Sequence, residues 1–526
     1  MTAGFFPRHP TLFRTLAFAV TVTTLHACTS WQRTSDQPMT VVAKAPETIR
    51  VNLRTGAQVT LHAPFLAADS LGGFRRLGDE RTRVIVPVSD VQSIEVRRVS
   101  AGRTILLTAA LGATVLLIAA AASADWGPTW TGGGGGGGDG GGESCPLVYA
   151  WNGSAWHLVS GTFGGSIARP LARSVLDNLD SVAPQDGTLR LEVTNELPET
   201  DYLDALQLLA VDHEPGLSVA SDPTGRLHTI GTLAPPVSAT DFRGASALDR
   251  VRNLDRWGWE SSFTGRDTAR AADLRDGLLL AFLRPSGAAR AHLVLDATNT
   301  PWAVHLLNTF IAAHGAGTDA WYDSLNAQPA LAMALGMRLG GEGFLAASVR
   351  TPSGWTATGS YWLVGPETFR RQVLDVDLSQ VTGDTVFVRL ESAPALWLVD
   401  RVAMDFTADR PMTVSGSSLL SARDKTGRDV APLIASADGS DWVMQPGDSA
   451  QLTFRLPGQA AGTSRTLMLR SSGWYRVHVP SVGAPDVAML EAVMHTPLGI
   501  SRTTVARMNA ALARLSPPPG GSPALH

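Results

Sequence analysis

The stretch Leu147-Val-Tyr-Ala-Trp-Asn-Gly-Ser-Ala-Trp-His-Leu-Val159 decides the fold class of this chain. Apolar and polar residues alternate on both sides of Asn152-Gly153, and alternation with a period of two is typical of strands. Asn and Gly both accept positive φ values, so the pair is a strong signal for a hairpin turn. Trp151 and Trp156 flank this turn and are expected to pair across it. The sequence therefore predicts a β-rich body that opens with a hairpin.

Alternating stretches recur downstream and predict further strands. They lie at Thr188–Val193, Ala205–Val211, Leu345–Val349, Gly354–Thr358, Val373–Leu378, Thr385–Leu390, Leu396–Phe406 and Trp474–Val479. The succession between residues 353 and 406 is typical of a jelly-roll sandwich. Galactose-binding-like modules share this pattern, so carbohydrate binding is a hypothesis at the level of the fold alone.

Three segments carry apolar residues at helical spacing. Trp302–His314 and Asp319–Leu339 predict a pair of helices, with Pro329 starting or kinking the second one. Val505–Leu515 predicts a helix before a disordered, proline-rich tail. The fold class expected for the body is thus mainly β with a minor α component, as β-sandwich or jelly-roll-like domains with a helical insertion.

Upstream of the body, residues 40–100 predict a small separate β module. Alternating stretches lie at Thr48–Leu53, Gln58–His62, Arg83–Val88 and Ser93–Arg97, with turns expected at Thr55-Gly56 and Gly72-Gly73. Four or five short antiparallel strands fit an SH3-like or Sm-like barrel. The step Val86–Asp90 is expected to form a corner between two strands.

Two unusual segments connect this module to the body. Thr104–Ala124 is uncharged and long enough for a transmembrane helix. The unbroken glycine run Gly132–Gly138 behaves as flexible coil, which makes it a linker. A phosphate-binding glycine loop would need a following lysine and helix, which the sequence lacks.

The N-terminus has the features of an export signal. Arg8, His9 and Arg14 precede the apolar run Thr15–Ala27, which has signal-peptide length. The run ends in Leu25-His26-Ala27-Cys28, which resembles the lipobox of bacterial lipoproteins, although His26 departs from the usual small residue. The resemblance implies cleavage before Cys28 and diacylglycerol on its sulfur. Two or three acyl chains give stable membrane anchoring.

The two apolar runs conflict in topology, and three arrangements stay open. Residues 104–124 cross the membrane and place the body in the cytoplasm, or the N-terminal run is no export signal and the body lies outside. In the third arrangement, the run packs against protein or lies shallowly in the membrane. Arg97, Arg98 and Arg103 would oppose the positive-inside tendency if the run crossed inward. We expect membrane association in the bacterial cell envelope, with an extracytoplasmic body.

These features divide the chain of 526 residues into consecutive segments. They are a signal peptide at 1–27, a tether at 28–39, the barrel-like module at 40–100, the apolar helix at 104–124, the glycine-rich linker at 125–144, a β-rich domain at 145–300, the helical pair with a jelly-roll-like domain at 301–410, a C-terminal β segment at 411–482, and a helix with the tail at 483–526.

Composition excludes some partners. A net charge of -4 provides no basic field for phosphates, which argues against nucleic acid. The chain has two cysteines, and if Cys28 carries lipid, Cys145 has no disulfide partner within the chain. Cys145 precedes an apolar strand and is predicted to be a small buried residue.

Motifs for catalysis, metals and cofactors do not match this sequence. The histidines lack the helical spacing of a metalloprotease, and nucleophile-elbow and nucleotide-binding glycine patterns are absent. Asp177, Asp180 and Asp186 lie near a turn but lack the ligand spacing of a calcium loop. Asp212 and His213 are adjacent on a strand and so point to opposite faces. The prediction is therefore no catalytic, metal or cofactor site, with Cys28 as the lipidation site.

The body through Asp212-His213 and Leu227-His228 resembles an uncharacterised family of large bacterial envelope lipoproteins. This resemblance covers about residues 144–410 and implies no catalytic residue. The favoured hypothesis is a non-enzymatic scaffold or binding module that contacts membrane lipid through Cys28 and residues 104–124, and an envelope protein or glycan through its body. The alternatives are a hydrolase of envelope polymers with a dispersed site, and a subunit of a membrane assembly or transport complex.

Overall fold

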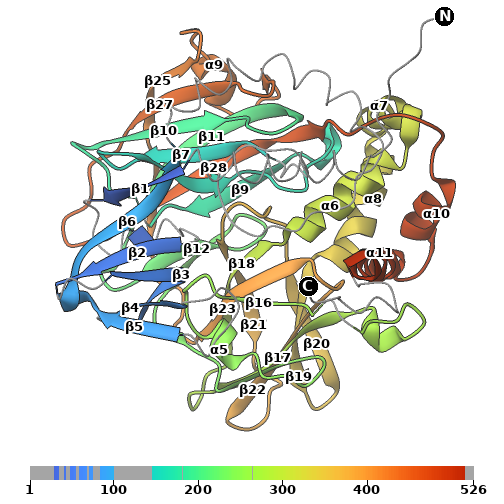
Figure 1. Cartoon of the computed structure of the whole chain (residues 1–526), viewed down its shortest axis with the longest axis horizontal. Coiled ribbons are helices and arrows are strands. Elements are labelled where there is room, and N and C mark those ends of the chain that lie inside the picture. Colours follow the sequence, from blue (N-terminus) through green and yellow to red (C-terminus); the bar gives the residue numbers. More distant parts are fainter. Residues whose placement is uncertain are drawn as a thin grey trace, which may run out of the picture. The chain divides into compact units, whose positions relative to one another are not determined.

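The computed structural model describes residues 29–34, 41–42, 48–54, 58–67, 70–74, 83–99, 145–180, 182–262 and 265–515 (Figure 1). The chain forms two compact units, Met1–Asp139 and Gly140–His526, whose boundary lies within the predicted glycine-rich linker. Cys28 with its signal peptide, the apolar run 104–124 and the tail 516–526 lie outside the described residues. No helix in the described ranges is long and apolar enough to span a membrane.

The described part of the N-terminal unit is an antiparallel sheet with strand order β1-β6-β2-β3-β4-β5. Its strands are β1 (Thr29–Thr34), β2 (Thr48–Leu53), β3 (Gln58–Ala67), β4 (Ser70–Phe74), β5 (Arg83–Pro87) and β6 (Val91–Val99). The four strands predicted for this module are confirmed. Val41, Ile49, Val51, Leu61, Leu71 and Ile94 form its small core. The predicted corner contains a 3₁₀ turn at Val88–Asp90.

The turn predicted at Gly72-Gly73 is wrong, because both glycines lie inside β4. Close packing explains their presence in a strand. A Cβ at Gly73 would lie 2.8 Å from Leu61 Cβ, and a Cβ at Gly72 would collide with the ring of Phe65. The glycines therefore allow β3 side chains to lie over the neighbouring strand.

The C-terminal unit contains a first β sandwich whose strands come from both ends of the unit. One sheet has the order β25-β27-β10-β7-β8, and the other has the order β24-β11-β28-β9 with β26 paired to β11. The bounds are β7 (Leu147–Trp151), β8 (Trp156–Gly161), β9 (Arg173–Asn178), β10 (Thr188–Thr194), β11 (Glu199–His213), β24 (Thr413–Gly416), β25 (Ser418–Asp424), β26 (Trp442–Met444), β27 (Ser449–Arg455) and β28 (Ser464–Val477). Strands predicted in segments 145–300 and 411–482 thus share sheets.

A second sandwich is inserted between β11 and β24. Its sheets have the orders β13-β12-β21-β18-β23-β14, with β16 paired to β23, and β15-β17-β22-β19-β20. The bounds are β12 (Ser218–Ser221), β13 (Leu227–Ile230), β14 (Leu233–Ala234), β15 (Ser238–Asp241), β16 (Trp259–Glu260), β17 (Asp276–Leu283), β18 (Arg290–Asn299), β19 (Leu345–Thr351), β20 (Gly354–Tyr361), β21 (Arg370–Asp377), β22 (Thr385–Ser392) and β23 (Trp397–Asp405).

Each sandwich has its own apolar core, formed by alternate residues of two facing sheets. Leu191 of β10 and Leu208 of β11 belong to the first core. Leu293 of β18 and Val388 of β22 belong to the second. Burial of each such side chain contributes about 1.5–3 kcal/mol, so the alternating pattern is also the main source of stability. The prediction of a mainly β body is confirmed.

The longer helices lie at one side of the two sandwiches (Figure 1). They are α6 (Pro301–Ala312), α7 (Thr318–Ala327), α8 (Pro329–Gly343), α10 (Val487–His495) and α11 (Gly499–Leu515). Pro329 occupies the first turn of α8, where a missing N–H costs nothing, so the predicted helix 319–339 is two helices. Trp302 of α6 packs in the second core and Phe310 in the first, so this helix joins both cores.

The hairpin that opens the body is confirmed, with a longer loop than a two-residue turn. Trp151 and Trp156 are directly opposite in β7 and β8, and their ring centroids lie 5.4 Å apart. Gly153 has a φ of +99°, whereas Asn152 does not have positive φ. Instead, the Asn152 side chain accepts hydrogen bonds from the backbone N–H groups of Ser154 and Ala155, both at 2.9 Å. The side chain thus closes a four-residue loop.

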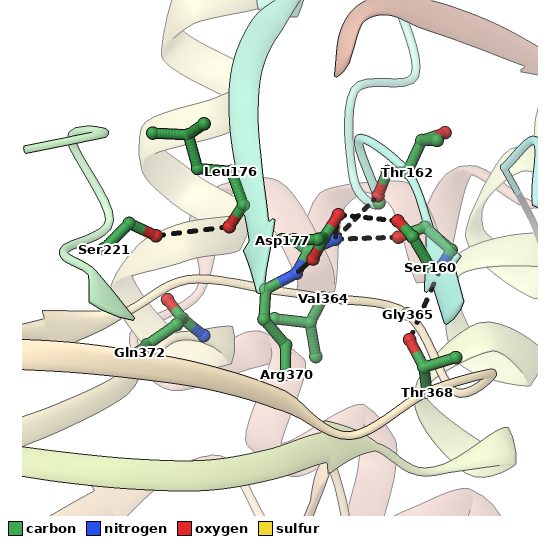
Figure 2. A network of polar contacts seen from close by, with 12 residues as sticks. Ser160, Thr162, Leu176, Asp177, Ser221, Val364, Gly365, Thr368, Arg370 and Gln372 are labelled. Carbon is green, nitrogen blue, oxygen red and sulfur yellow. Dashed lines mark hydrogen bonds and ion pairs between the residues drawn. The ribbon is translucent and has the colours of Figure 1, made fainter. Parts of the chain in front are cut away.

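A buried ion pair connects the two sandwiches (Figure 2). Arg370 of β21 donates through Nε and Nη2 to both carboxylate oxygens of Asp177 on β9. Arg370 Nη2 also donates to the carbonyl oxygens of Gly161, at 2.7 Å, and Thr162. Ser160 Oγ donates to Asp177 Oδ2 at 2.5 Å. The side chains are only 5% and 6% exposed, so their hydrogen bonds replace those to water.

Two carboxyl groups point into one end of the first core. Glu199 and Asp201 lie two residues apart on β11 and are almost completely buried. Glu199 Oε1 accepts a hydrogen bond from the backbone N–H of Cys145 at 2.6 Å. Burial raises the pKa of both carboxyls, and the neighbouring Glu199 raises the pKa of Asp201 further. Cys145 is buried as predicted, and burial raises the pKa of its thiol.

Glu199→Gln is expected to increase the free energy of unfolding at neutral pH. The raised pKa means that folding favours the protonated carboxyl, so its contribution to stability is complete below the ordinary value of about 4.3 and decreases as pH rises through the folded-state pKa. Glutamine stays neutral and keeps the acceptor for Cys145. Urea unfolding at pH 5 and pH 7.5 measures the difference. The exposed Glu214→Gln is the control, and equal pH dependence of Glu199→Gln and the unsubstituted chain would contradict the argument.

Candidate metal centre

A cluster of histidine and aspartate side chains lies on the face of the β18 sheet that points away from the second core. Leu293 and Leu295 of β18 belong to that core, so the alternation of the strand turns His292 to the opposite face. His292 is directly opposite Asp375 of β21 in the antiparallel register. The distance from His292 Nε2 to Asp375 Oδ1 is 3.2 Å. The sheet itself therefore fixes one imidazole–carboxylate pair.

The hairpin of β12 and β13 brings a second histidine to this pair. His228 of β13 is buried, and its ring centroid lies 4.9 Å from that of His292. His228 Nδ1 lies 3.8 Å from Asp375 Oδ1. The turn between the strands is closed by Asp222, whose Oδ1 accepts from the N–H groups of Thr224 and Arg226.

Asp409 completes the cluster from the segment that follows β23. Its Oδ1 accepts from the backbone N–H of Thr229 at 3.0 Å, and the N–H of Arg410 donates to Thr229 Oγ1 at 2.8 Å. These contacts hold the carboxylate so that Oδ2 lies 3.1 Å from His228 Nδ1 and 3.8 Å from His292 Nε2.

The spacing of these atoms is suited to a metal ion. His228 Nδ1, His292 Nε2 and Asp375 Oδ1 belong to a group whose ligand atoms lie within 4.8 Å of one another. The four nitrogen–oxygen distances range from 3.1 to 3.8 Å. A tetrahedron with metal–ligand bonds of about 2.0–2.1 Å has edges of about 3.3–3.4 Å. His228, His292 and Asp375 are therefore spaced to hold one ion, and Asp409 lies beside them with its Oδ2 3.1 Å from His228 Nδ1.

The local charge also fits a divalent cation. Four aspartates surround the rings: Asp222, Asp375, Asp405 and Asp409. Two arginines, Arg226 and Arg290, contact this group, which leaves an excess of two negative charges when the rings are neutral. Burial lowers the pKa of His292, and the neighbouring His228 lowers it further. Asp409 and Asp375 raise this pKa and so partly offset the effect. The neutral imidazole is the form that binds metals.

The cluster is buried on the histidine side and open on the carboxylate side. The His228 and His292 side chains are 1% and 8% exposed, whereas those of Asp375 and Asp409 are 33% and 32% exposed. Within the described ranges, His228 Nε2 and His292 Nδ1 make no hydrogen bond, although His228 Nε2 lies 3.8 Å from Asp222 Oδ2. An ion could therefore enter past the carboxylates and be held by oriented rings.

The acidic residues considered for calcium are not gathered into a site. Asp177 is bound to Arg370 and Ser160, while the backbone N–H of Asp180 donates to Asn178 Oδ1. Asp186 has a φ of 48° in the turn before β10. These residues pair with arginine or shape turns.

Asp212 and His213 also contact separate partners. Asp212 receives two hydrogen bonds from Arg465, which holds the pKa of the carboxyl below its ordinary value. His213 Nε2 lies 3.0 Å from Thr466 Oγ1, and its Nδ1 lies 3.0 Å from the carbonyl oxygen of Glu214. Adjacent residues of β11 thus point to different surroundings, as the alternation of a strand requires.

No metal site is expected from the sequence, in which this cluster is not recognisable. A search for two histidines at helical spacing cannot find ligands on separate strands, because the register between strands brings them together. The segment Arg290-Ala-His-Leu-Val-Leu-Asp296 does carry a polar signal, because His292 and Asp296, four positions apart, interrupt an apolar strand. That signal alone does not identify Asp375, Asp409 or His228 as neighbours.

An apolar cavity of about 120 Å³ lies apart from the metal cluster, where the helices meet the two sandwiches. Val304, Phe310, Leu339, Met489 and Ile500 are among its lining residues. None of the residues lining this cavity is charged, so it holds no pair of carboxylates of the kind that an envelope-polymer hydrolase would use.

Comparison of the chain with models of protein families, with curated proteins and with solved structures finds no match.

Proposed function

We propose that this chain is a membrane-anchored module of the bacterial envelope whose second sandwich binds one divalent transition-metal ion, with a binding role in place of catalysis. The observation that carries the proposal is the set of four nitrogen–oxygen distances of 3.1–3.8 Å among His228, His292, Asp375 and Asp409. Strand pairing fixes the backbones of His228, His292 and Asp375, and a backbone hydrogen bond holds the carboxylate of Asp409, before any ion binds.

The donor set favours zinc over the hard alkaline-earth ions. Two imidazole nitrogens with carboxylate oxygens suit Zn²⁺ and neighbouring transition metals, whereas Ca²⁺ takes six to eight oxygen ligands. Asp222 would act as the outer partner of His228, since its carboxylate lies on the side of the ring away from the cluster.

Metal titration of the full chain tests this proposal. The detergent-solubilised protein is treated with a chelator, dialysed and titrated with Zn²⁺ and, separately, Ca²⁺, with bound metal measured by mass spectrometry. We expect one Zn²⁺ per chain with a dissociation constant of about 1 μM or tighter, and weaker Ca²⁺ binding. Failure to retain Zn²⁺ at about 100 μM would remove the proposed metal function.

The anchor is proposed from the lipobox resemblance at Leu25–Cys28. Cys28→Ser is expected to abolish incorporation of a labelled fatty acid. Cys145→Ser is the matched control, because Cys145 is buried and should not accept lipid. Undiminished labelling of Cys28→Ser would exclude the lipobox.

Finer features of the architecture are also proposals. The N-terminal sheet supports an SH3-like module, because β6 pairs with β2 after a 3₁₀ turn. The second sandwich is proposed to be of jelly-roll type, and residues 104–124 to associate with the membrane. Protease accessibility of the body in intact cells and spheroplasts tests its extracytoplasmic location.

A further inference from the structure

Arg226 lies at the open side of the metal cluster and contacts both of its exposed carboxylates. Its Nη1 lies 3.6 Å from Asp375 Oδ2, and its Nη2 lies 3.7 Å from Asp409 Oδ2. The backbone of Arg226 is fixed, because its N–H donates to Asp222 Oδ1 and its carbonyl oxygen accepts from the N–H of Asp222. The side chain, in contrast, is 63% exposed. A rigid turn thus presents an adjustable cation to the cluster.

We propose that Arg226 is a resident cation that balances the carboxylates when metal is absent, which makes the centre an exchangeable metal site. The inference rests on the metal-binding function proposed above and adds the way in which that site is regulated. It predicts that the arginine competes with the ion, so that metal is bound and released without leaving two unbalanced carboxylates.

The contacts of Asp409 explain the competition. Its Oδ2 is the oxygen nearest to Arg226 and also the oxygen that faces both histidine rings. A bound ion would draw electron density from this oxygen and repel the guanidinium. Asp375 differs, because Oδ1 faces the rings while Oδ2 faces Arg226. Competition therefore acts mainly through Asp409 and through repulsion between the two cations.

The contacts of Arg226 with the two carboxylates are long. Separations of 3.6 and 3.7 Å exceed those of ordinary charge-assisted hydrogen bonds, so the guanidinium is attracted without being locked. Whatever Arg226 contributes to the metal-free protein must be lost when metal binds. Removal of Arg226 then destabilises the metal-free protein but not the metal-bound protein. By the thermodynamic cycle, metal binding becomes more favourable by the same free energy that the metal-free protein loses.

Arg290 provides a matched control. It belongs to the same exposed surface and carries the same charge, but its ion pair with the described residues of the cluster is with Asp375 Oδ2, at 4.0 Å, and its side chain is 77% exposed. A general effect of surface charge would act equally through both arginines. The proposed role of Arg226 would not, because the Asp409 contact is specific to it.

The experiment compares zinc affinity of the full chain and of Arg226→Gln and Arg290→Gln, using competition with a chromophoric chelator after metal removal. We expect Arg226→Gln to bind Zn²⁺ about 10-fold more tightly and Arg290→Gln less than about threefold more tightly. Thermal unfolding should show a lower Tm for metal-free Arg226→Gln and an unchanged Tm for its zinc-loaded form.

Two results would overturn the inference while leaving the metal site intact. Unchanged or weaker Zn²⁺ binding by Arg226→Gln would show that the arginine does not compete, and equal changes in both variants would show a nonspecific charge effect. Absence of Zn²⁺ binding by the unsubstituted chain would instead overturn the proposed function itself, so the two failures are distinct.

Discussion

Arg370→Met is expected to lower the free energy of unfolding by about 3–5 kcal/mol, because it leaves the buried carboxylate of Asp177 without its counter-ion. Methionine keeps the apolar stem of the arginine side chain but lacks the guanidinium group, so the variant chiefly removes the charge and its hydrogen bonds. Asp177 would keep one hydrogen bond from Ser160. Because Arg370 also donates to Gly161 and Thr162, two carbonyl oxygens would lose a donor as well.

Urea unfolding followed by tryptophan fluorescence measures this effect. Arg428→Met is the control, because Arg428 is exposed and its loss should change stability by less than about 0.5 kcal/mol. The double variant Arg370→Met with Asp177→Leu removes both charges and should recover part of the loss. A single variant as stable as the control would show that the ion pair does not hold the sandwiches together.

His292→Ala is expected to weaken Zn²⁺ binding by at least about 100-fold. Four ligands of a structural zinc site share a binding free energy of about 10–16 kcal/mol, so one ligand accounts for about 3 kcal/mol. His292 lies within reach of both carboxylates, and no other described histidine besides His228 joins this cluster.

The measurement is the same chelator competition, with His495→Ala as the control. His495 is 71% exposed on α10 and belongs to no metal cluster among the described residues, so zinc affinity should be unchanged. Circular dichroism of both variants checks that the fold is kept. Equal affinities of His292→Ala and His495→Ala would place the ion elsewhere.

Local patterns predicted most elements of the fold, because strands and helices follow from residues close in sequence. The Trp151–Trp156 hairpin follows from the turn signal at Asn152-Gly153. The start of α8 follows from Pro329, whose ring favours the first turn of a helix. The strand through Gly72 and Gly73 was missed, since glycine signals a turn unless a packed neighbour such as Leu61 requires it. Glycine alone cannot distinguish the two cases.

Pairing between distant segments could not be predicted in the same way. Nothing in Thr188–Thr194 identifies Ser449–Arg455 as its neighbour in the sheet, because many strands share the same apolar alternation. The metal cluster depends on this kind of information. His292 meets Asp375 through register, and Asp409 arrives through its hydrogen bond with Thr229. A single sequence does not contain those relations in readable form.

The nesting of one sandwich within the other sets an order of events during translation. All strands of the inner sandwich have been synthesised once Asp405 has left the ribosome, but β10 must wait for β27, roughly 250 residues later. At about 5–20 residues per second, that delay is roughly 10–50 s, during which an apolar strand has an open edge. The body would therefore depend most on chaperones while only its N-terminal half has been synthesised. Folding of the inner sandwich would bring β11 and β24, the outer strands on either side of it, close together in space.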